Sequence, residues 1–392
     1  MKKVLILNTS HNDLRLILAL KEMGFYVVSI GNRPGLVGEK YVNQYIQMDY
    51  SCKEEVLALS RKLNIDAICA CCNDIGVITA AYVAEEMGLP GHDSYENTLI
   101  MHHKDRFKKF AREYGITTPQ SEYFLEEEDA VKWLDKAEYP IIVKPTDLSA
   151  GRGVAKADCY EEAKSAIKNA FEHSRIKHIV IEPYIDGSQH ACCTFILNKK
   201  VVAYCTNNEY SFVNPYRVEI DTYPADNFDC VRDHLINEAE KMVNILGLKD
   251  GILSMQYRIK DGKPYIIEAM RRILGNLYMI PAEKLTGINW DYWEARTHCG
   301  LDCSHFPVDI QQQHGFWAYR TIMGTQNGVV KSLVVPDDLR KYIFDECILW
   351  RSGDYIKDYM SEPLAFLFFK FDSKEEMNHV MLDQYNRIYA EY

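Results

Sequence analysis

The stretch Lys144-Pro145-Thr146-Asp147-Leu148-Ser149-Ala150-Gly151-Arg152-Gly153-Val154 follows directly on the apolar run Ile141-Ile142-Val143. An apolar, β-branched run predicts a buried strand, so a lysine at a strand end leads into a short loop of small residues. The two glycines allow the main chain to approach an anion closely, and the lysine and the arginine supply positive charge. The stretch therefore predicts a phosphate-binding loop.

This loop differs from two well-known phosphate-binding sequences. No Gly-Lys-Ser/Thr follows it, as a Walker A loop requires, and the third glycine of a dinucleotide fingerprint is missing. Taken alone, the stretch is equally compatible with a strand that ends in an ordinary flexible turn. A different nucleotide-binding fold therefore needs support from other segments.

Length and composition restrict the class of protein. A chain of 392 residues suggests about two to four domains, and 47% hydrophobic with 26% charged residues is ordinary for a globular protein. The formal net charge of −11 argues against a general affinity for nucleic acid or for anionic lipid. No apolar run reaches the roughly 18 residues of a membrane span. We therefore expect a cytoplasmic protein with no nucleic-acid partner and no membrane partner.

The twelve cysteines are scattered along a large chain, which argues against a disulfide framework. The tightest group of metal-ligating types is His298, Cys299, Cys303 and His305. Structural zinc sites use paired ligand units, and no second such unit accompanies this group. Buried free cysteines are the preferred interpretation.

The first hundred residues alternate between strand and helix patterns. Apolar runs at 4–7 and 25–30 flank a helical pattern, and helices over 53–63 and 75–87 flank a strand over 67–71. Such alternation predicts a parallel sheet with helices on both faces. The first turn, Asn8-Thr9-Ser10-His11, contains no glycine, so a dinucleotide-binding domain is not expected.

A basic helix from residue 103 to 114 indicates a domain boundary near residue 100. A helix over 160–173 follows the glycine loop, and then strands dominate, with a helix over 232–246 between them and a terminal helix over 374–389. The expected strands cover 179–182, 191–196, 201–206, 252–259 and 265–269.

Taken together, these segments resemble the ATP-grasp superfamily, most strongly between Lys104 and Asn276. The resemblance is to the carboxylate–amine ligase type, as in the carbamoyl phosphate synthetase large chain and phosphoribosylglycinamide synthetase. It implies a mixed α/β and α+β fold. A parallel αβα pre-ATP-grasp domain (1–100) would precede an ATP-grasp domain (101–300) of two subdomains (101–184 and 185–300). Residues 301–392, in which Gly353-Asp354-Tyr355-Ile356 and the strand 366–371 resemble the corresponding part of several ligases, would form a small C-terminal domain.

The resemblance also implies which residues bind ATP. The two phosphate lysines of the family match Lys104 and Lys144, and Glu182-Pro183-Tyr184-Ile185 matches the hinge that contacts adenine. An acid that often holds the ribose is replaced by Gln189, which can still hydrogen-bond to hydroxyl groups. The implied ATP-binding residues are Lys104, Lys144, Ser149, Gly151, Arg152, Gly153, Val154, Glu182, Tyr184, Ile185 and Gln189.

Glu268-Ala269-Met270-Arg271-Arg272 resembles the metal and phosphate strand of the family. Strand alternation places Glu268, Met270 and Arg272 on one face. The resemblance implies that Glu268 holds Mg²⁺ and that Arg272 binds the transferred phosphoryl group. Gln256 stands where the preceding strand normally offers an acid, and Asn276 is the candidate to supply a further oxygen. A plain ion pair between Glu268 and Arg271 is the alternative interpretation.

The implied reaction uses ATP and Mg²⁺ to convert a carboxylate to an acyl phosphate, which an amine or a similar nucleophile then attacks. His190, Asn208 and Arg217 are the candidate contacts to these small-molecule substrates. A kinase-like enzyme that stops at phosphorylation and an ATP-binding regulatory protein without turnover are the alternatives. The sequence leaves the substrates and the oligomeric state open, a homodimer included.

Overall fold

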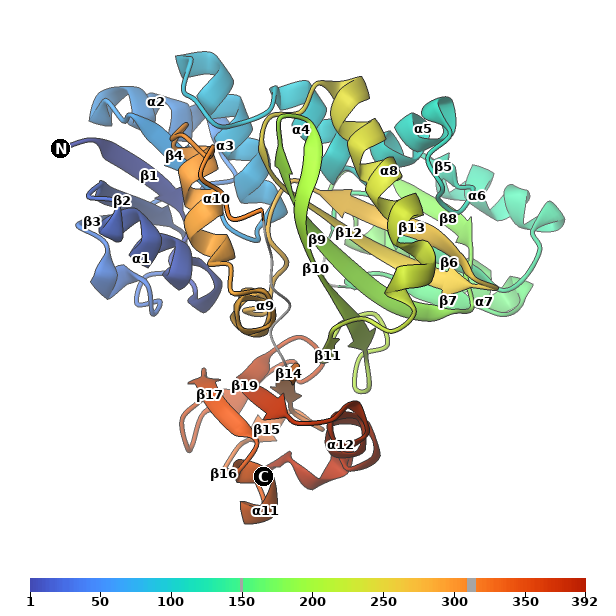
Figure 1. Cartoon of the computed structure of the whole chain (residues 1–392). Coiled ribbons are helices and arrows are strands. Elements are labelled where there is room, and N and C mark those ends of the chain that lie inside the picture. Colours follow the sequence, from blue (N-terminus) through green and yellow to red (C-terminus); the bar gives the residue numbers. More distant parts are fainter. Residues whose placement is uncertain (149–150, 309–314) are drawn as a thin grey trace.

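A four-stranded parallel sheet forms the N-terminal part of the molecule (Figure 1). The computed structural model describes residues 1–148, 151–308 and 315–392. The strands β1 (Lys3–Leu7), β2 (Tyr26–Gly31), β3 (Gln44–Gln47) and β4 (Ala67–Cys69) pair in the order β3-β2-β1-β4. The helices of this part are α1 (Leu14–Glu22), α2 (Lys53–Leu63) and α3 (Asp74–Met87). The predicted parallel sheet is confirmed.

The central strand β1 is buried on both faces, as parallel strands usually are. Its side chains alternate between two cores: Val4 and Ile6 pack with the α1 side, while Leu5 and Leu7 pack with α2 and α3. Helix α10 (Trp290–His298) returns from much later in the chain to contact α1 and β4. The first core therefore depends on residues that are almost 300 positions apart.

A second, antiparallel sheet carries the glycine loop. Its strands β5 (Glu122–Phe124), β6 (Ile141–Pro145), β7 (Ala155–Ala157) and β8 (Ile179–Pro183) pair in the order β5-β8-β6-β7. Helices α6 (Glu127–Trp133) and α7 (Tyr160–His173) cover one face of this sheet and share its apolar core. Helices α4 (Tyr95–His102) and α5 (Lys104–Tyr114) connect it to the N-terminal part. Lys144 lies near the end of β6, and Gly151 and Gly153 follow it in the loop before β7.

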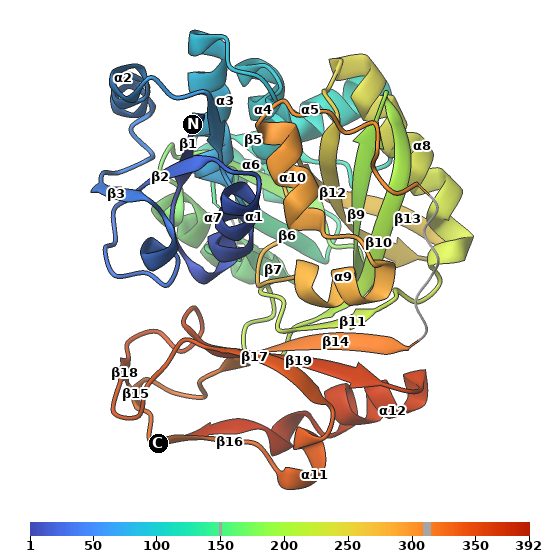
Figure 2. The ribbon, with the colours of Figure 1, turned by 60° about the vertical axis from the view of Figure 1, so that its left-hand side comes forward.

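The third sheet has eight strands in the order β13-β12-β9-β10-β11-β14-β19-β17 (Figure 2). Helix α8 (Phe228–Leu246) packs on its first half, and α9 (Met279–Thr286) contacts β10 and β14. The strands are β9 (Ser188–Leu197), β10 (Lys200–Tyr210), β11 (Ile220–Tyr223), β12 (Gly251–Lys260), β13 (Lys263–Met270), β14 (Phe316–Met323), β17 (Ile343–Ile348) and β19 (Pro363–Phe371). Since β11 pairs with β14, the C-terminal strands continue the same sheet.

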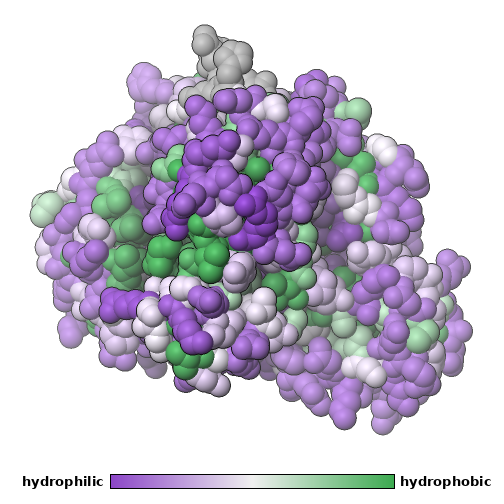
Figure 3. All heavy atoms as spheres, turned by 90° about the horizontal axis from the view of Figure 1, so that it is seen from below, coloured by the Kyte–Doolittle hydropathy of each residue, from purple (hydrophilic) through white to green (hydrophobic). Residues whose placement is uncertain are grey.

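The remaining C-terminal elements are short. They are β15 (Gly328–Val329), β16 (Ser332–Val334), β18 (Tyr355–Ile356), β20 (Tyr389–Glu391), α11 (Asp337–Arg340) and α12 (Lys374–Asn378). The predicted helix over 374–389 is confirmed in most of its length: α12 continues into a π-helical segment over His379–Asp383 and a 3-10 turn over Tyr385–Arg387. The prediction is wrong at its last residue, because Tyr389 begins β20, which pairs with β16. Polar residues cover most of the face that carries these elements, with apolar residues in patches (Figure 3).

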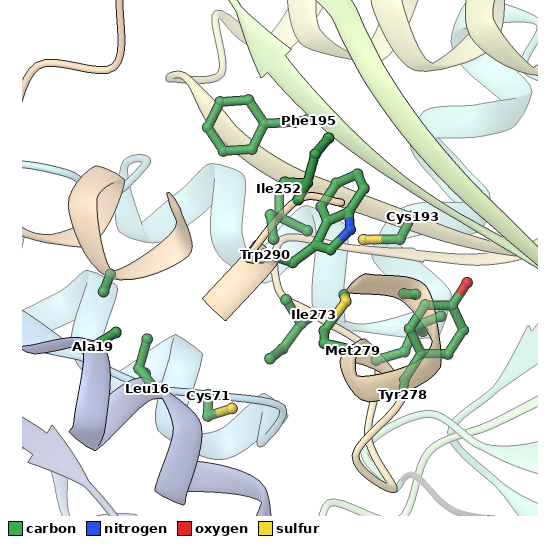
Figure 4. Packing of buried hydrophobic residues seen from close by; sticks show 14 of the residues in the cluster. Leu16, Ala19, Cys71, Cys193, Phe195, Ile252, Ile273, Tyr278, Met279 and Trp290 are labelled. Carbon is green, nitrogen blue, oxygen red and sulfur yellow. The ribbon is translucent and has the colours of Figure 1, made fainter. Parts of the chain in front are cut away.

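The largest apolar cluster joins the N-terminal sheet to the eight-stranded sheet. Trp290 is fully buried, and its indole donates to Thr286 Oγ1 at 3.0 Å. Leu16 and Cys71 come from the N-terminal part, Cys193 and Phe195 come from β9, and all belong to the same cluster as Trp290 (Figure 4). The two sheets therefore share one core. No helix among the described residues is long and apolar enough to cross a membrane.

A buried acid lies inside this shared core. Glu294 on α10 is 1% exposed, and its Oε1 accepts a hydrogen bond from the Ile273 N–H at 3.1 Å. Its Oε2 has no partner among the described residues. Burial raises the pKa of Glu294 to about 8, so the folded chain holds a proton that the unfolded chain releases.

We expect stability to fall as the pH rises from about 4.5 to about 8, by up to about 1.4 kcal/mol per pH unit, because the raised pKa favours the folded state only while the carboxyl stays protonated. Glu294→Gln mimics the protonated acid. The variant should match the wild type at pH 5 and exceed it at pH 8 in urea denaturation. Parallel pH profiles for the two proteins would contradict this role of Glu294.

Candidate nucleotide and substrate site

A cavity of about 430 Å³ lies between the β6–β8 sheet and the first strands of the eight-stranded sheet. Most of the residues predicted for ATP, metal and substrate line this one cavity. They are Lys104, Lys144, Gly151, Val154, Glu182, Tyr184, Ile185, Gln189, Arg217, Gln256, Glu268, Arg272 and Asn276. The fold therefore brings together side chains that lie up to 172 positions apart, from Lys104 to Asn276. The volume of the cavity suits a small ligand.

Two predicted residues of the glycine loop do not line this cavity, and a third is not among the described residues. Arg152 lines a larger, adjoining cavity, and Ser149 lies outside the described residues. Gly153 does not line either cavity. Both glycines have positive φ angles, and a Cβ on Gly151 would collide with the main chain of Tyr216. The close approach of two chain segments thus requires glycine at position 151.

Lys104 connects three parts of the site. It begins helix α5, and its Nζ donates to the Leu148 carbonyl at 2.8 Å in the loop after β6. The same Nζ lies 3.6 Å from Glu268 Oε2 on β13. A cation is therefore held between the loop and the predicted metal-binding acid, where a phosphate chain could contact it.

Lys144 shares a buried carboxylate with a second lysine. Its Nζ donates to Glu182 Oε2 at 2.9 Å, and Lys108 Nζ lies 3.2 Å from Glu182 Oε1. Burial opposes the charge on Glu182, but the two lysines outweigh it and lower its pKa. Burial also lowers the pKa of Lys108 to about 8. The side chain of Glu182 therefore positions lysines.

The hinge segment Glu182 to Ile185 spans the end of β8 and differs in how its main-chain groups are paired. The Tyr184 N–H donates to the Pro140 carbonyl at 2.9 Å, and the Ile185 carbonyl accepts from Arg258 at 3.2 Å. The Ile185 N–H has no hydrogen-bond partner among the described residues. It is the donor that this segment offers to a ring nitrogen of a bound base.

Polar side chains form a row across five strands on the cavity face of the large sheet. Strand pairing sets Glu268 opposite Gln256, and Glu209 opposite Asp221. Glu209 accepts hydrogen bonds from Gln189 Nε2 at 2.8 Å and from Gln256 Nε2 at 2.9 Å. Sequence reasoning missed Glu209, although the polar run Asn207-Asn208-Glu209 that continues an apolar strand was a usable signal.

The two acids of this row that face each other are both buried. Burial raises the pKa of Glu209 to about 7, and burial together with Glu209 raises the pKa of Asp221. At neutral pH the pair therefore does not carry two full negative charges. Glu268, with a side chain 32% exposed, is the accessible carboxylate.

These residues fit a magnesium ion better than a metal held by protein ligands alone. Within the described residues, no three His, Cys, Asp or Glu side chains are grouped as metal ligands, and this includes the group near Cys299. Mg²⁺ commonly takes one or two carboxylates and completes its shell with water and phosphate oxygens. Glu268 could supply the carboxylate. Gln256 and Asn276 use their amide nitrogens toward Glu209 and Val218, which leaves the amide oxygens.

The structure places two predicted substrate contacts away from the cavity. His190 and Asn208 are cross-strand neighbours, and each lies one position from a residue that lines the cavity, so alternation points them to the opposite face. His190 stacks on Tyr257 with ring centroids 5.3 Å apart, and Asn208 donates to Thr222 Oγ1 at 2.9 Å. Neither side chain lines this cavity, whereas Arg217 does.

Two arginines at the end of β13 bind the N-terminal part. Arg272 Nε donates to Asp74 Oδ1 at 2.6 Å, and Asp74 also accepts from His102 at 3.0 Å. Arg271 Nε donates to Asp93 Oδ2 at 2.7 Å. The alternative pair of Glu268 with Arg271 is therefore wrong. Asp74 holds a predicted catalytic arginine in place at the rim of the cavity.

We expect Asp74→Asn to destabilise the protein by about 2 to 4 kcal/mol, because it leaves a buried guanidinium without its counter-ion. Equilibrium unfolding in urea measures this loss. Glu86→Gln breaks the exposed pair with Arg61 and serves as the control, with an expected loss below about 1 kcal/mol. Equal effects of the two substitutions would contradict the role of Asp74.

Comparison with known proteins finds relatives of part of this chain. The family model for the phosphoribosylglycinamide synthetase ATP-grasp (A) domain matches residues 102–215. The carbamoyl phosphate synthase large chain of Caldanaerobacter subterraneus is 25% identical over 273 residues, which are 66% of this chain and 24% of that protein. The chain thus spans about a quarter of the length of the curated relatives that it matches first.

Solved structures match over the whole chain. The L-amino acid ligase from Bacillus licheniformis has a TM-score of 0.84 at 20% identity, with 100% of this chain and 99% of that chain covered. Phosphoribosylglycinamide synthetase from Anaerococcus prevotii has a TM-score of 0.76 at 21% identity, with the same coverage. These matches confirm the fold of the ATP-grasp ligases for this chain, and the family model confirms the resemblance over residues 102–215.

Proposed function

We propose that the chain is an ADP-forming ligase that activates a small carboxylate with ATP and joins it to an amine or a similar nucleophile. The observation that carries the proposal is the convergence of Lys104, Lys144 and Glu268 on one cavity beside an unpaired hinge N–H. The family model, the matched synthetases and the matched L-amino acid ligase support the same class of reaction.

ATP would lie along the cavity with its base at the hinge. The Ile185 N–H would donate to the adenine, and Gln189 would contact the ribose. The triphosphate would then lie between the loop at Gly151, Lys144 and Lys104, where positive charge and main-chain groups are available. Arg272 and Glu268 would lie at the phosphate end, because both also line the adjoining cavity.

In the first step, a carboxylate oxygen of the substrate attacks the γ-phosphorus, and the bond to the ADP oxygen breaks. In the second step, an amine nitrogen attacks the acyl carbon, and inorganic phosphate leaves. Little covalent chemistry is required of the protein, so rate depends on alignment and on neutralised charge. A cation about 4 Å from a phosphate contributes about 4 kcal/mol at an effective dielectric constant of about 20.

Mg²⁺ would neutralise phosphate charge when it is bound. Glu268 is the residue that we assign to it, with the Gln256 and Asn276 amide oxygens as further ligands. Gln256 has a role that an acid at this position could not fill, because its amide nitrogen donates hydrogen bonds to the carboxyl group of Glu209. A glutamate at position 256 would bring a third carboxylate next to Glu209 and Glu268.

Lys104→Ala should lower the rate of ATP turnover at least about tenfold, a loss of about 1.4 kcal/mol of transition-state stabilisation. ADP release in a coupled assay measures the rate, and a thermal melt checks the fold. Lys109→Ala, on the exposed side of the same helix, is the matched control and should leave the rate unchanged. Turnover that survives in Lys104→Ala would remove this lysine from the site.

Glu268→Gln should raise the Mg²⁺ concentration for half-maximal ADP release at least about tenfold, because a neutral amide is a weaker ligand for a hard cation. Binding of Mn²⁺ in the presence of ADP, followed by electron paramagnetic resonance, gives a second readout that needs no turnover. Chelation of the metal should abolish ADP release in the wild type. Unchanged Mn²⁺ affinity in the variant would contradict the assignment.

The identity of the reaction is tested by a pairwise screen of carboxylates and amines, with ADP and product mass as readouts. Formation of an amide together with ADP supports the ligase. A stable phosphorylated acid as the final product would indicate a kinase-like enzyme, and ATP binding with no ADP from any pair would indicate a regulatory protein.

A further inference from the structure

A second cavity of about 710 Å³ lies where the N-terminal sheet faces the ATP-grasp part. The segments after all four parallel strands contribute to its lining: Asn8 after β1, Arg33 after β2, Tyr50 after β3 and Asn73 after β4. The cavity is therefore built at the carboxyl edge of the sheet. Its volume lies within the range of small-molecule sites.

The strand order explains why a crevice forms at this edge. The chain runs from β1 through β2 to β3 on one side, and then crosses to β4 on the other side of β1. The segments that leave β1 and β4 therefore diverge, and ligands of open parallel sheets bind at such a point. The lining residues Ser10 and Asn12 on one side and Cys72 and Asn73 on the other belong to these two segments.

The second cavity is continuous with the nucleotide cavity. Lys104, Glu268 and Arg272 line both, together with Asn12, Cys72, Leu148 and Met270. A molecule in the second cavity can therefore present one end to the place where we put the terminal phosphate of ATP. Its other end would remain near the N-terminal loops.

The acids that line this second cavity are engaged by protein donors. Asp13 accepts from the Ser10 N–H at 2.8 Å, and Asp74 accepts from Arg272. Asp147 accepts from Ser174 Oγ and from the Arg175 N–H, each at 2.9 Å. Glu268 lies next to Lys104. Each of these carboxylates therefore has a protein donor or a cation beside it.

Two exposed arginines of the lining, Arg33 and Arg175, differ from these acids in having no paired side chain among the described residues. Arg33 and Arg175 are exposed, and within the described part of the chain neither guanidinium has a hydrogen bond or an ion pair. They come from the segments after β2 and after α7, so two separate parts of the fold direct positive charge to one opening. His11, also in the lining, does not add to this charge, because burial and Arg217 lower its pKa to about 4.

We propose that the second cavity binds the carboxylate substrate, and that this substrate carries a second anionic group, a carboxylate or a phosphate, held by Arg33 and Arg175. The reacting carboxylate lies at the shared end, near Lys104 and Arg272. Guanidinium groups pair with either kind of anion through two parallel hydrogen bonds. This assignment of substrate class rests on the proposed ligase function.

The test compares acids that share a carbon chain but differ in the second anion. Succinate and phosphoglycolate are compared with butyrate and glycolate, and the full-length protein carries Mg²⁺ and a non-hydrolysable ATP analogue. Calorimetry measures binding without turnover. Arg33→Gln with Arg175→Gln is the test variant, and Lys168→Gln, an exposed cation on α7 outside both cavities, is the matched control.

We expect at least one dianionic acid to bind about tenfold or more tightly than its monoanionic partner. The double variant should lose this preference, while Lys168→Gln and the affinity for the ATP analogue stay unchanged. The succinate and phosphoglycolate arms identify which second anion is preferred. Equal binding of monoanions and dianions, or an unchanged preference in the double variant, would overturn the inference.

ADP release with hydrolysable ATP is measured on the same panel. ADP release without a preference for dianions would contradict the assignment of substrate class but would still support the proposed ligase function. Dianion-selective binding that Arg33 and Arg175 control, but that no acid converts into ADP release, would support the binding site and count against the ligase.

Discussion

The ion pairs of Arg271 and Arg272 with two aspartates of the N-terminal part are the constraint on which the site depends. Each pair is formed by a guanidinium at the end of β13 and a carboxylate that lies about 180 to 200 positions earlier. Buried charges are tolerated only when they are paired, so the N-terminal sheet cannot move away from β13 without exposing or isolating them. The position of β13, and with it Glu268, is thereby fixed relative to the loops of the N-terminal part.

A second principle sorts the side chains of the large sheet. Successive residues of a strand face opposite sides, so Gln189 and Glu209 line the cavity while His190 and Asn208 pack on the other face. The same rule divides β1 between two cores. A polar residue beside a site residue in sequence is therefore not evidence for a shared role in the site.

The departure of this chain from the ATP-grasp pattern at Gln256 is connected to the buried acid Glu209. Gln256 stands where an acid was expected, and its amide binds Glu209 on a strand two positions away in the sheet. The row of polar residues therefore still contains a buried carboxylate, but it is Glu209 on β10 instead of an acid at position 256 on β12. Burial raises the pKa of Glu209 to about 7, so this carboxyl is partly protonated near neutral pH. Partial protonation limits its repulsion with Glu268.

The sequence alone determined much of the order of elements and the resemblance to ATP-grasp proteins, because both depend on local patterns. Helices α2 and α7 match the predicted ranges, and the strand before Lys144 and the apolar alternation of β12 and β13 were visible in the residues themselves. From the glycine loop and the resemblance we predicted a set of site residues, and thirteen of them line one cavity in the structure.

Only the tertiary structure decided which polar side chains meet. Three arrangements depend on contacts between segments far apart in the chain. Lys108 and Lys144 both pair with Glu182, Arg272 pairs with Asp74, and Glu209 accepts from Gln256. No local pattern contains those distances. The irregular form of the terminal helix was not visible in the sequence either: α-helical geometry ends at Asn378, and π-helical and 3-10 segments follow before β20 pairs with β16.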